Sequence, residues 1–306
     1  MANRIIYYFL ILPISYLPYF FLYRLSDFTF FVMYYLIGYR KKVVLNNIKN
    51  SFLHLSTSEH RQIMRKFYQH FCDLVLESLK GFTISEKQLN KRFKVRDRTV
   101  VDKLYDEGKN IVFVGGHFNN WEMLALGVSM QMKHLLIGIY KPLSNKYFDE
   151  KMQKSRQRFG MMLCPMKQTR RFFEEDFGKP KGIIFGIDQS PSNPKSAYWM
   201  NFLNQDTPMF YGAEKYAKEF NMPVVYGVIH KPKRGYYEAE FRLVTTTPNE
   251  TAYGEIIEKS NKMLEEDINQ LPQYWLWTHK RWKHKKPHLT SRKNGTGSPK
   301  EGKSLP

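Results

Sequence analysis

One stretch, residues 110–126, constrains the fold of this chain more than any other. It begins with a short apolar run, passes through Gly115 and Gly116 to His117, and continues after two asparagines with a helical pattern. A β-branched run, two glycines and an asparagine cap in that order predict a strand, a tight turn and a helix. The chain is therefore expected to be of the α/β class.

His117 and Glu122 form a candidate catalytic pair inside this stretch. They are five residues apart, which on one continuous helix would place their side chains about 140° apart. They can meet only if His117 lies in the turn and Glu122 in the first turn of the helix, with Asn119 or Asn120 as the N-cap. His117 would then be a general base and Glu122 the carboxylate that orients it. A core histidine with its hydrogen bonds satisfied is the structural alternative.

The same spacing recurs at His54 and Glu59, where it has a structural explanation. Ser56 and Glu59 are spaced as a capping box, in which the glutamate accepts the backbone N–H of the serine. Only His117 follows a strand and two glycines. We therefore predict that His117, and not His54, belongs to a catalytic site.

Composition narrows the possible partners and cofactors. The 306 residues carry a net charge of +20, which predicts an anionic partner such as nucleic acid, anionic lipid or an acidic carrier protein. Cys72 and Cys164 are too few for a disulfide framework, and no Cys or His is spaced around them as a zinc ligand. No metal and no cofactor is expected. No G-x-S-x-G elbow occurs to mark a covalent nucleophile.

The N-terminus predicts a membrane anchor over residues 1–40. Residues 5–23 carry no charge and are about long enough to cross a hydrocarbon core, and a second apolar run covers residues 28–38. The first run is too long for a signal peptide and lacks an A-x-A site. We expect an uncleaved anchor that spans or re-enters the membrane, with a buried helix pair as the alternative. The Arg-Lys-Lys at residues 40–42 would keep the remaining chain cytoplasmic.

Periodicity and turn residues predict the other elements. The strands are expected at residues 93–96, 135–140 and 181–188, and as a hairpin at 224–230 and 236–244. The helices are expected at residues 43–53, 56–81, 102–108, 145–159 and 249–271, and from an N-cap at Thr207 to Phe220. Residues 287–306 are rich in Gly, Ser, Pro, Lys and Arg, which predicts a disordered basic tail.

Two of these elements carry further candidate site residues. Asp188 and Gln189 end the strand at 181–188, and polar residues at such strand ends either shape a site or cap the turn. Arg156 and Arg158 lie late in the helix at 145–159, where they either bind an anionic group or form a solvated helix end.

Several stretches together resemble the lipid A late acyltransferases, the lauroyl and myristoyl acyltransferases that are related to lysophospholipid acyltransferases. They cover residues 5–285 in the family's order. The motifs are Asn47-Ile48-x3-Phe52, Gly116-His117-x4-Glu122, Tyr140-Lys141-Pro142, Arg156-x-Arg158-x-Gly160, Asp188-Gln189, Phe202, Thr207, Gly212 and Trp275-x-Trp277-x-His279-x-Arg281-Trp282-Lys283. Leu53 replaces a common proline. Asn204 replaces a common glycine, and asparagine tolerates the left-handed backbone that the loop would need.

The resemblance implies a central mixed, largely parallel sheet flanked by helices, as in glycerolipid acyltransferases, within residues 41–286. It implies transfer of a fatty acyl chain from a thioester, most often on acyl carrier protein, to a hydroxyl of a lipid A precursor or similar glycolipid. The reaction would occur on the cytoplasmic side of the bacterial inner membrane.

The resemblance also implies roles for the candidate residues. His117 would activate the acceptor hydroxyl, and Arg156 and Arg158 would hold a phosphate or the carrier. Backbone N–H groups near Gly115 and Gly116, or an arginine, would stabilise the oxyanion.

Alternatives stay open at this point. The acceptor could be an aminolipid or another membrane lipid, and the donor could be a coenzyme A thioester. In a different class, a basic nucleic-acid-binding protein would suit Trp282 among lysines and arginines, and a membrane scaffold would need no catalysis. The anchor and the lack of a nucleic-acid motif argue against nucleic acid as a partner. Trp275, Trp277 and Trp282 are expected in the core rather than in the site.

Overall fold

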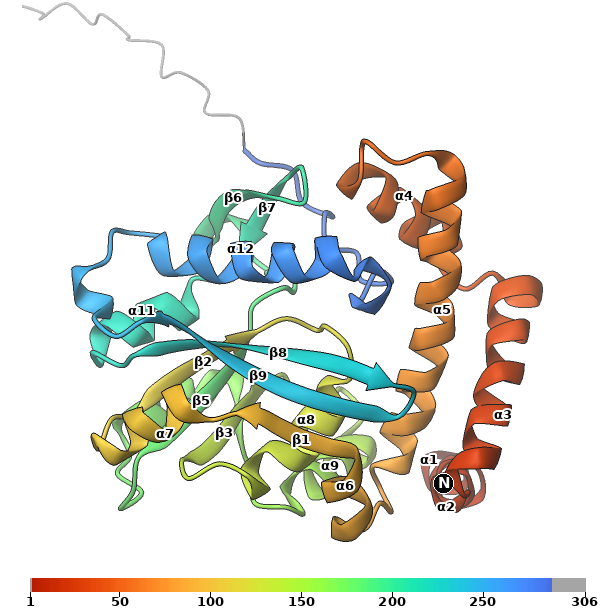
Figure 1. Ribbon diagram of the computed structural model, residues 1–306, viewed down its shortest axis with the longest axis horizontal. Coiled ribbons are helices and arrows are strands. Elements are labelled where there is room, and N and C mark those ends of the chain that lie inside the picture. Colours follow the sequence, from red (N-terminus) through yellow and green to blue (C-terminus); the bar gives the residue numbers. More distant parts are fainter. Residues whose placement is uncertain (1, 288–306) are drawn as a thin grey trace, which may run out of the picture.

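The computed structural model describes residues 2–287. Its centre is a seven-stranded sheet in the order β1-β9-β8-β2-β5-β3-β4 (Figure 1). Within the described chain, every neighbouring pair in this sheet is parallel except β8 and β9. The strands are β1 (Phe93–Asp97), β2 (Ile111–Gly115), β3 (Leu135–Tyr140), β4 (Met162–Pro165), β5 (Lys181–Gly186), β8 (Val224–Lys233) and β9 (Tyr236–Thr245). The predicted mixed, largely parallel sheet is confirmed. The predicted tail lies outside the described residues apart from Pro287.

Helices cover both faces of the sheet because its strand residues alternate between two apolar layers. On β2, Val112 and Val114 belong to one layer, and Ile111 and Phe113 belong to the other. The first layer receives α4 (Lys41–Ser51), α5 (Thr57–Lys80), α10 (Thr169–Glu174), α11 (Gly212–Glu219) and α12 (Glu255–Gln270). The second receives α6 (Glu86–Arg92), α7 (Thr99–Asp106) and α8 (Trp121–Gly127), and α9 (Lys146–Gln157) lies beside α8.

Two predicted helix starts are confirmed by their caps. Ser56 and Glu59 form both hydrogen bonds of a capping box at the start of α5. Asn120 is the N-cap of α8, and its Oδ1 accepts the backbone N–H of Met123 at 2.9 Å. Asn119 has a φ of +59° and lies in the turn before the cap. His117 is therefore off the helix, as the spacing required.

The helix predicted from Thr207 to Phe220 is present, but its predicted start is wrong. Residues 205–209 form β7 (Gln205–Met209), which pairs antiparallel with β6 (Tyr198–Phe202) in a separate two-stranded sheet. The helix α11 begins only at Gly212. Because this sheet has only two strands, both are edge strands. Proline, which lacks a backbone N–H, is tolerated at Pro208 because an edge strand has a neighbour on one side only. Similarly, α12 begins at Glu255 and not at residue 249, after a short 3-10 turn.

The turn between β6 and β7 explains the asparagine that departs from the family pattern. Leu203 and Asn204 have φ values of +50° and +62°. Two left-handed residues form the tight turn that suits a two-residue hairpin. Asparagine adopts this conformation more readily than most residues, so Asn204 preserves the loop as predicted.

Two helical segments make up the region of the predicted anchor, and whether it spans or re-enters the membrane stays a prediction. Residues 5–23 do not form one helix, because Pro18 ends the first helical segment and begins a second. The segments are α1 (Ala2–Ile6), η1 (Tyr7–Ile11) and α2 (Leu12–Tyr16), and then α3 (Tyr19–Phe31) and η2 (Val32–Ile37). Leu17 is extended, with ψ 135°, as a residue before proline prefers. Among the described residues, one helix, Tyr19–Ile37, is long and apolar enough to cross a membrane by length and composition.

Candidate active site

The site forms where two neighbouring parallel strands end. β2 and β5 pair in register at Gly115 and Gly186, and His117 and Asp188 each lie two residues further along. Because both strands run in the same direction, the two side chains meet beyond the same edge of the sheet. Asp188 Oδ1 lies 2.6 Å from His117 Nδ1, and Asp188 Oδ2 accepts the backbone N–H of His117 at 2.7 Å.

Asp188 is a buried carboxylate with three hydrogen-bond donors around it. The third donor is the indole N–H of Trp275, 2.8 Å from Oδ2. Burial raises the pKa of Asp188, but the charge of His117 and the hydrogen bonds from His117 and Trp275 outweigh it and bring the pKa to about 2. Asp188 is therefore an anion that can only accept, so Nδ1 of His117 carries the proton.

This bond leaves the lone pair of neutral His117 on Nε2. The His117 side chain is 23% exposed, and its Nε2 lies 3.1 Å from the amide nitrogen of Gln189. Burial lowers the pKa of His117, but Asp188 and, more weakly, Glu122 outweigh burial and raise it. A hydroxyl placed at Nε2 would meet a proton acceptor that is more basic than ordinary histidine.

The carboxylate that holds the imidazole is not the one expected. Glu122 lies in the first turn of α8, as predicted, but its two oxygens accept a bidentate pair from Arg156 at 2.6 and 3.0 Å. The contact with the imidazole that was predicted for Glu122 is made by Asp188, because strand pairing brings the ends of β2 and β5 together. Asp188 is 71 residues from His117 along the chain, so spacing alone could not have ranked it above Glu122.

The two arginines at the end of α9 have different surroundings. Arg156 lines a small cavity of about 70 Å³ together with Tyr140, Lys141 and Asp149. Arg158 donates instead to three backbone carbonyls that follow α5, those of Gly81, Phe82 and Ile84. Basic side chains commonly satisfy the carbonyls of a helix end in this way. Arg158 therefore contacts the end of α5, whereas Arg156 contacts Glu122, and a substrate-binding role stays a prediction for both.

The glycines at the strand ends have packing reasons to be glycine. A Cβ on Gly115 would lie 2.8 Å from the carbonyl oxygen of Gly227, and one on Gly116 would lie 2.6 Å from Leu264 Cδ1. A Cβ on Gly186 would lie 3.1 Å from His117 Cε1. Backbone thus excludes a side chain at Gly115, and a side chain at Gly116 or Gly186 would require Leu264 or His117 to move. A role of Gly115 and Gly116 as oxyanion donors stays a prediction.

The sequence interpretation placed Trp275 in the core and missed its contact with Asp188. The segment around Trp275 also contacts the turn that carries His117, because the backbone N–H of Asn119 donates to Tyr274 O at 2.8 Å. His279 Nε2 accepts the backbone N–H of Ser190 at 3.1 Å, and burial lowers the pKa of His279. A signal for both residues existed, since Trp275 and His279 belong to the last motif of the family resemblance.

The cysteines offer no activated nucleophile. Both are buried and free. Burial raises the pKa of the Cys72 thiol to about 12 and also raises that of Cys164, and an activated thiol needs the opposite shift. Within residues 2–287, His, Cys, Asp and Glu form no cluster that could hold a metal ion.

A family model described as bacterial lipid A biosynthesis acyltransferase matches residues 2–284, which include the whole sheet and the His117 site. The chain belongs to this family. No curated protein matches the chain. The lipid A acyltransferase family confirms the resemblance and makes this chain an acyltransferase. It gives no support to the alternatives of a nucleic-acid-binding protein or a scaffold without catalysis.

Proposed function

We propose that this acyltransferase moves a fatty acyl chain from acyl carrier protein to a hydroxyl of a lipid A precursor or similar glycolipid, with His117 as the general base. One observation carries the proposal: Nδ1 of His117 lies 2.6 Å from the buried, ionised Asp188, which leaves Nε2 to face the acceptor. A buried carboxylate in this position selects the tautomer of the base and stabilises the imidazolium that forms.

The reaction needs one base and no covalent intermediate. Neutral His117 takes the proton of the acceptor hydroxyl at Nε2 while the oxygen attacks the carbonyl carbon of the thioester. The tetrahedral oxyanion then collapses, the C–S bond breaks, and the thiolate leaves. A thiol has an ordinary pKa of about 8.5, so the thiolate leaves without acid assistance and is then protonated by the imidazolium. An ester, a free carrier thiol and neutral His117 result.

Other residues bind and position the reactants. Arg156 stands beside the base and lines a cavity with Lys141, which supports binding of a phosphate or of the thioester carrier by two cations. Glu122 accepts two hydrogen bonds from the Arg156 guanidinium and would fix its orientation. Gln189 contacts Nε2 of His117 and would orient the hydroxyl there. Backbone N–H groups near Gly115 and Gly116, or Arg156, would stabilise the oxyanion.

The charge of the chain supports the proposed partners and location. A net charge of +20 suits an acidic carrier protein and anionic headgroups. We place the enzyme on the cytoplasmic side of the bacterial inner membrane, held by its N-terminal helices, whose exposed side chains are largely apolar. The Arg-Lys-Lys at residues 40–42 favours this side.

An activity assay with the purified full chain tests the base. The protein in detergent is incubated with acyl carrier protein thioester and a lipid extract that contains the lipid A precursor, and mass spectrometry follows the acylated lipid. His117→Ala should abolish transfer. His54→Ala, an exposed histidine with the same spacing to a glutamate, should leave it unchanged. Transfer by His117→Ala would overturn its role as base, and transfer from coenzyme A thioester alone would overturn the proposed donor.

Lipids from cells that lack this protein test the acceptor. We expect lipid A species that lack one acyl chain. Unchanged lipid A together with a missing aminolipid would overturn the proposed acceptor while leaving the acyl-transfer chemistry intact.

A further inference from the structure

The N-terminal helices are bound along the C-terminal half of α5, from Tyr68 to Lys80. Carbonyl oxygens of Ser15 and Leu17 accept from Lys80 Nζ at 2.8 and 3.0 Å, near the end of α5. One turn back along α5, Tyr23 on α3 donates to Glu77 at 2.7 Å. Near the middle of α5, the ring of Tyr68 lies 5.5 Å from that of Tyr34 on η2, which continues α3. The helices α3 and α5 therefore run antiparallel, side by side.

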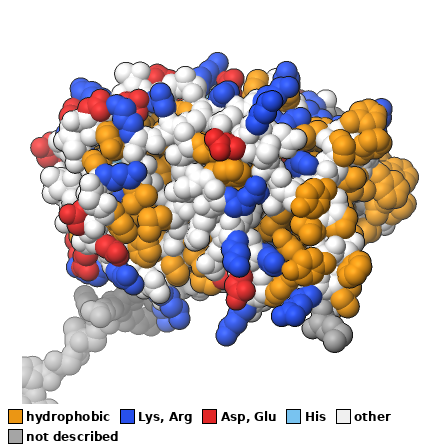
Figure 2. Space-filling view, turned by 90° about the horizontal axis from the view of Figure 1, so that it is seen from below, with side chains coloured by type: hydrophobic (Ala, Val, Ile, Leu, Met, Phe, Trp, Pro, Cys, Tyr) orange, Lys and Arg blue, Asp and Glu red, His pale blue; other side chains and the backbone are white. Residues whose placement is uncertain are grey.

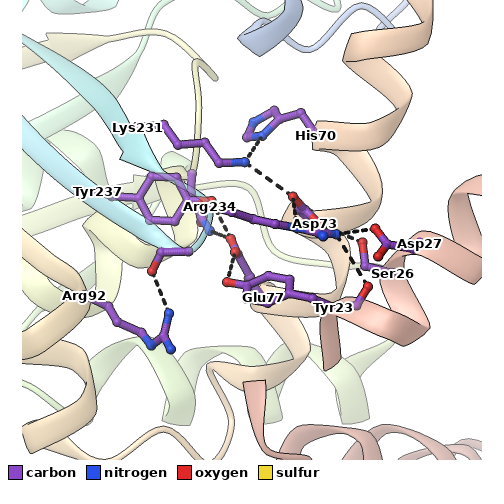
Figure 3. Close-up of polar contacts among 12 residues, drawn as sticks. Tyr23, Ser26, Asp27, His70, Asp73, Glu77, Arg92, Lys231, Arg234 and Tyr237 are labelled. Atoms are coloured by element: carbon purple, nitrogen blue, oxygen red, sulfur yellow. Dashed lines mark hydrogen bonds and ion pairs between the residues drawn. The ribbon is translucent and has the colours of Figure 1, made fainter. Parts of the chain in front are cut away.

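The contact between α3 and the domain is polar at its centre (Figure 3). Ser26 donates to the buried Asp73 at 2.8 Å. Arg234, from the turn between β8 and β9, bridges Asp73 and Asp27 with nitrogen–oxygen distances of 2.6 and 2.7 Å. Lys231 on β8 adds a further ion pair to Asp73 at 3.4 Å. These contacts join α3 to α5 and to the β8–β9 hairpin as one packed unit.

The opposite face of the N-terminal helices is apolar and exposed. Figure 1 views α1 and α2 end-on and α3 from the side, and both segments lie beyond α5, away from the sheet. Figure 2 shows hydrophobic side chains gathered at this end of the molecule, with Lys and Arg side chains next to them. The most exposed apolar side chains there are Phe9 (80%), Leu36 (68%), Tyr16 (67%), Ile37 (66%), Phe28 (64%) and Phe20 (63%).

This packing argues against a membrane-spanning α3. A spanning helix would stand along the membrane normal and carry α5 and the β8–β9 hairpin into the hydrocarbon beside it. The ion pairs of Asp73 with Lys231 and Arg234 would enter with them, and charged side chains inside a bilayer are costly. With α3 in the membrane plane, the same charges stay on the water side of the helix.

We propose that the α1–η2 region is an in-plane anchor whose exposed aromatic face lies in one leaflet of an anionic membrane. This inference rests on the membrane association in the proposed function and adds its geometry. Figure 1 shows α2 end-on and α3 from the side, so the two helices run in different directions, and both lie on the side of α5 that faces away from the sheet. Interfacial helices of this kind bury an apolar face about 5–10 Å deep at the boundary between headgroups and acyl chains.

Charge on the anchor fits anionic headgroups. Residues 1–42 contain five basic residues and one acidic residue. Arg24 is four residues from Phe20, so it projects from the same side of α3, about 40° away. Its guanidinium lies 5.3 Å from the Phe20 ring. An arginine on the lipid-facing side is suited to headgroup phosphates and unsuited to the hydrocarbon centre.

Depth measurements with spin labels test the proposal. Phe20 and Phe31 are both exposed on α3; eleven residues apart, they lie about 20° from each other around the helix and about 16 Å apart along it. Nitroxide labels on Phe20→Cys and Phe31→Cys, in the full chain bound to phosphatidylethanolamine–phosphatidylglycerol vesicles, should report the same shallow depth. Cys72 and Cys164 are buried and should not be labelled. Tyr253→Cys, at a 70% exposed aromatic position far from the anchor, is the aqueous control.

The outcomes separate this inference from the proposed function. Depths that differ by most of the 16 Å rise would overturn the in-plane anchor and leave a membrane enzyme with a spanning helix. Two labels as accessible to an aqueous relaxant as the Tyr253→Cys control would show that the face binds something other than lipid, and would also overturn it. Transfer activity is measured on the same samples, so loss of the proposed chemistry would be detected independently of depth.

Discussion

At the scale of single residues, the site depends on which carboxylate neighbours His117. Asp188 is buried, binds the ring and the backbone of His117, and receives the Trp275 indole. Glu122 reaches the ring only through its charge, because Arg156 takes both of its oxygens. The proposed function therefore gives the two carboxylates separate tasks, one orienting the base and the other positioning an arginine.

Replacing Asp188 tests the first task. Asp188→Asn should lower kcat/KM by on the order of 10³- to 10⁴-fold, as expected when an imidazole loses the carboxylate that selects its tautomer. Trp275→Phe removes only one donor to Asp188 and should cost far less. Steady-state kinetics on both variants measure this difference. Near-normal activity of Asp188→Asn would contradict the assignment.

Because Glu122 and Arg156 carry opposite charges near His117, replacing each should shift the pH profile of activity in opposite directions. The charge of Glu122 raises the pKa of His117 and that of Arg156 lowers it. The base works only when neutral, so activity falls as the pH drops through the His117 pKa, above the usual value near 6.5. Glu122→Gln should move this acidic limb of kcat/KM to lower pH, and Arg156→Gln should move it to higher pH. Shifts in the same direction would exclude this electrostatic arrangement.

At the scale of elements, the turn that carries His117 is held from three directions. Asn119 donates through its side chain to Ile229 O on β8 and through its backbone to Tyr274 O. Asn120 caps α8 with its oxygen and donates with its amide nitrogen to Glu77 on α5 at 2.6 Å. The same Glu77 accepts from Tyr23 and Tyr237, so α3, α5 and β9 all contact the group that holds the cap.

Glu77→Leu tests whether this cap positions the base. Leucine has no oxygen that can accept from Asn120, so the cap and the turn with His117 should loosen. Small displacements of reacting groups can cost up to about 10²-fold, and we expect a fall in kcat of up to that size with the KM for the carrier little changed. Tyr23→Phe, which removes only the donor to the other oxygen, is the matched control. Equal effects of the two variants would contradict a role through Asn120.

The β6–β7 turn allows a test of backbone conformation alone. Asn204 has a φ of +62° and also donates to Ser51 O at 2.9 Å. Both Asn204→Gly and Asn204→Ala lose that hydrogen bond, but only alanine is destabilised by the left-handed backbone conformation. The free energy of unfolding of Asn204→Ala should therefore lie about 1–2 kcal/mol below that of Asn204→Gly. Denaturant titrations compare them, and equal stabilities would show that the turn relaxes.

At the scale of the whole molecule, charge and apolar surface have separate effects on membrane binding. The excess of positive charge attracts the chain to anionic lipid over a distance limited by salt. The exposed face of the N-terminal helices supplies contact that salt does not screen. The proposed enzyme would thus meet an acidic carrier from solution and a lipid acceptor from the membrane surface.

Vesicle sedimentation separates these two contributions. Binding to anionic vesicles should exceed binding to zwitterionic ones, and added salt should reduce it to a residual level set by the apolar face. Each basic residue near the surface contributes about 1 kcal/mol. Lys42→Gln, beside the anchor, should therefore weaken binding about fivefold, whereas Lys215→Gln on α11 should not. Binding that is unchanged by both added salt and Lys42→Gln would contradict a contribution of charge to membrane binding.

The sequence by itself determined those features that depend on neighbours along the chain. The strand, turn and cap around His117, the β8–β9 hairpin and the start of α5 each follow from local patterns, and each is confirmed. The family motifs, taken in order, also identified the chemistry that the family match supports. Thr207-Pro208 is the exception, because tertiary pairing with β6 overrode a good local helix start.

Only the tertiary structure decided which side chains share the site. The pairing of β2 with β5 brings Asp188 to His117 across 71 residues, and the return of the C-terminal segment adds Trp275. Glu122, five residues from His117, is drawn to Arg156 on a neighbouring helix instead. Local spacing limits which residues can meet, but distant strands and helices decide which do, because the register of a sheet is set by pairing between segments far apart in the chain.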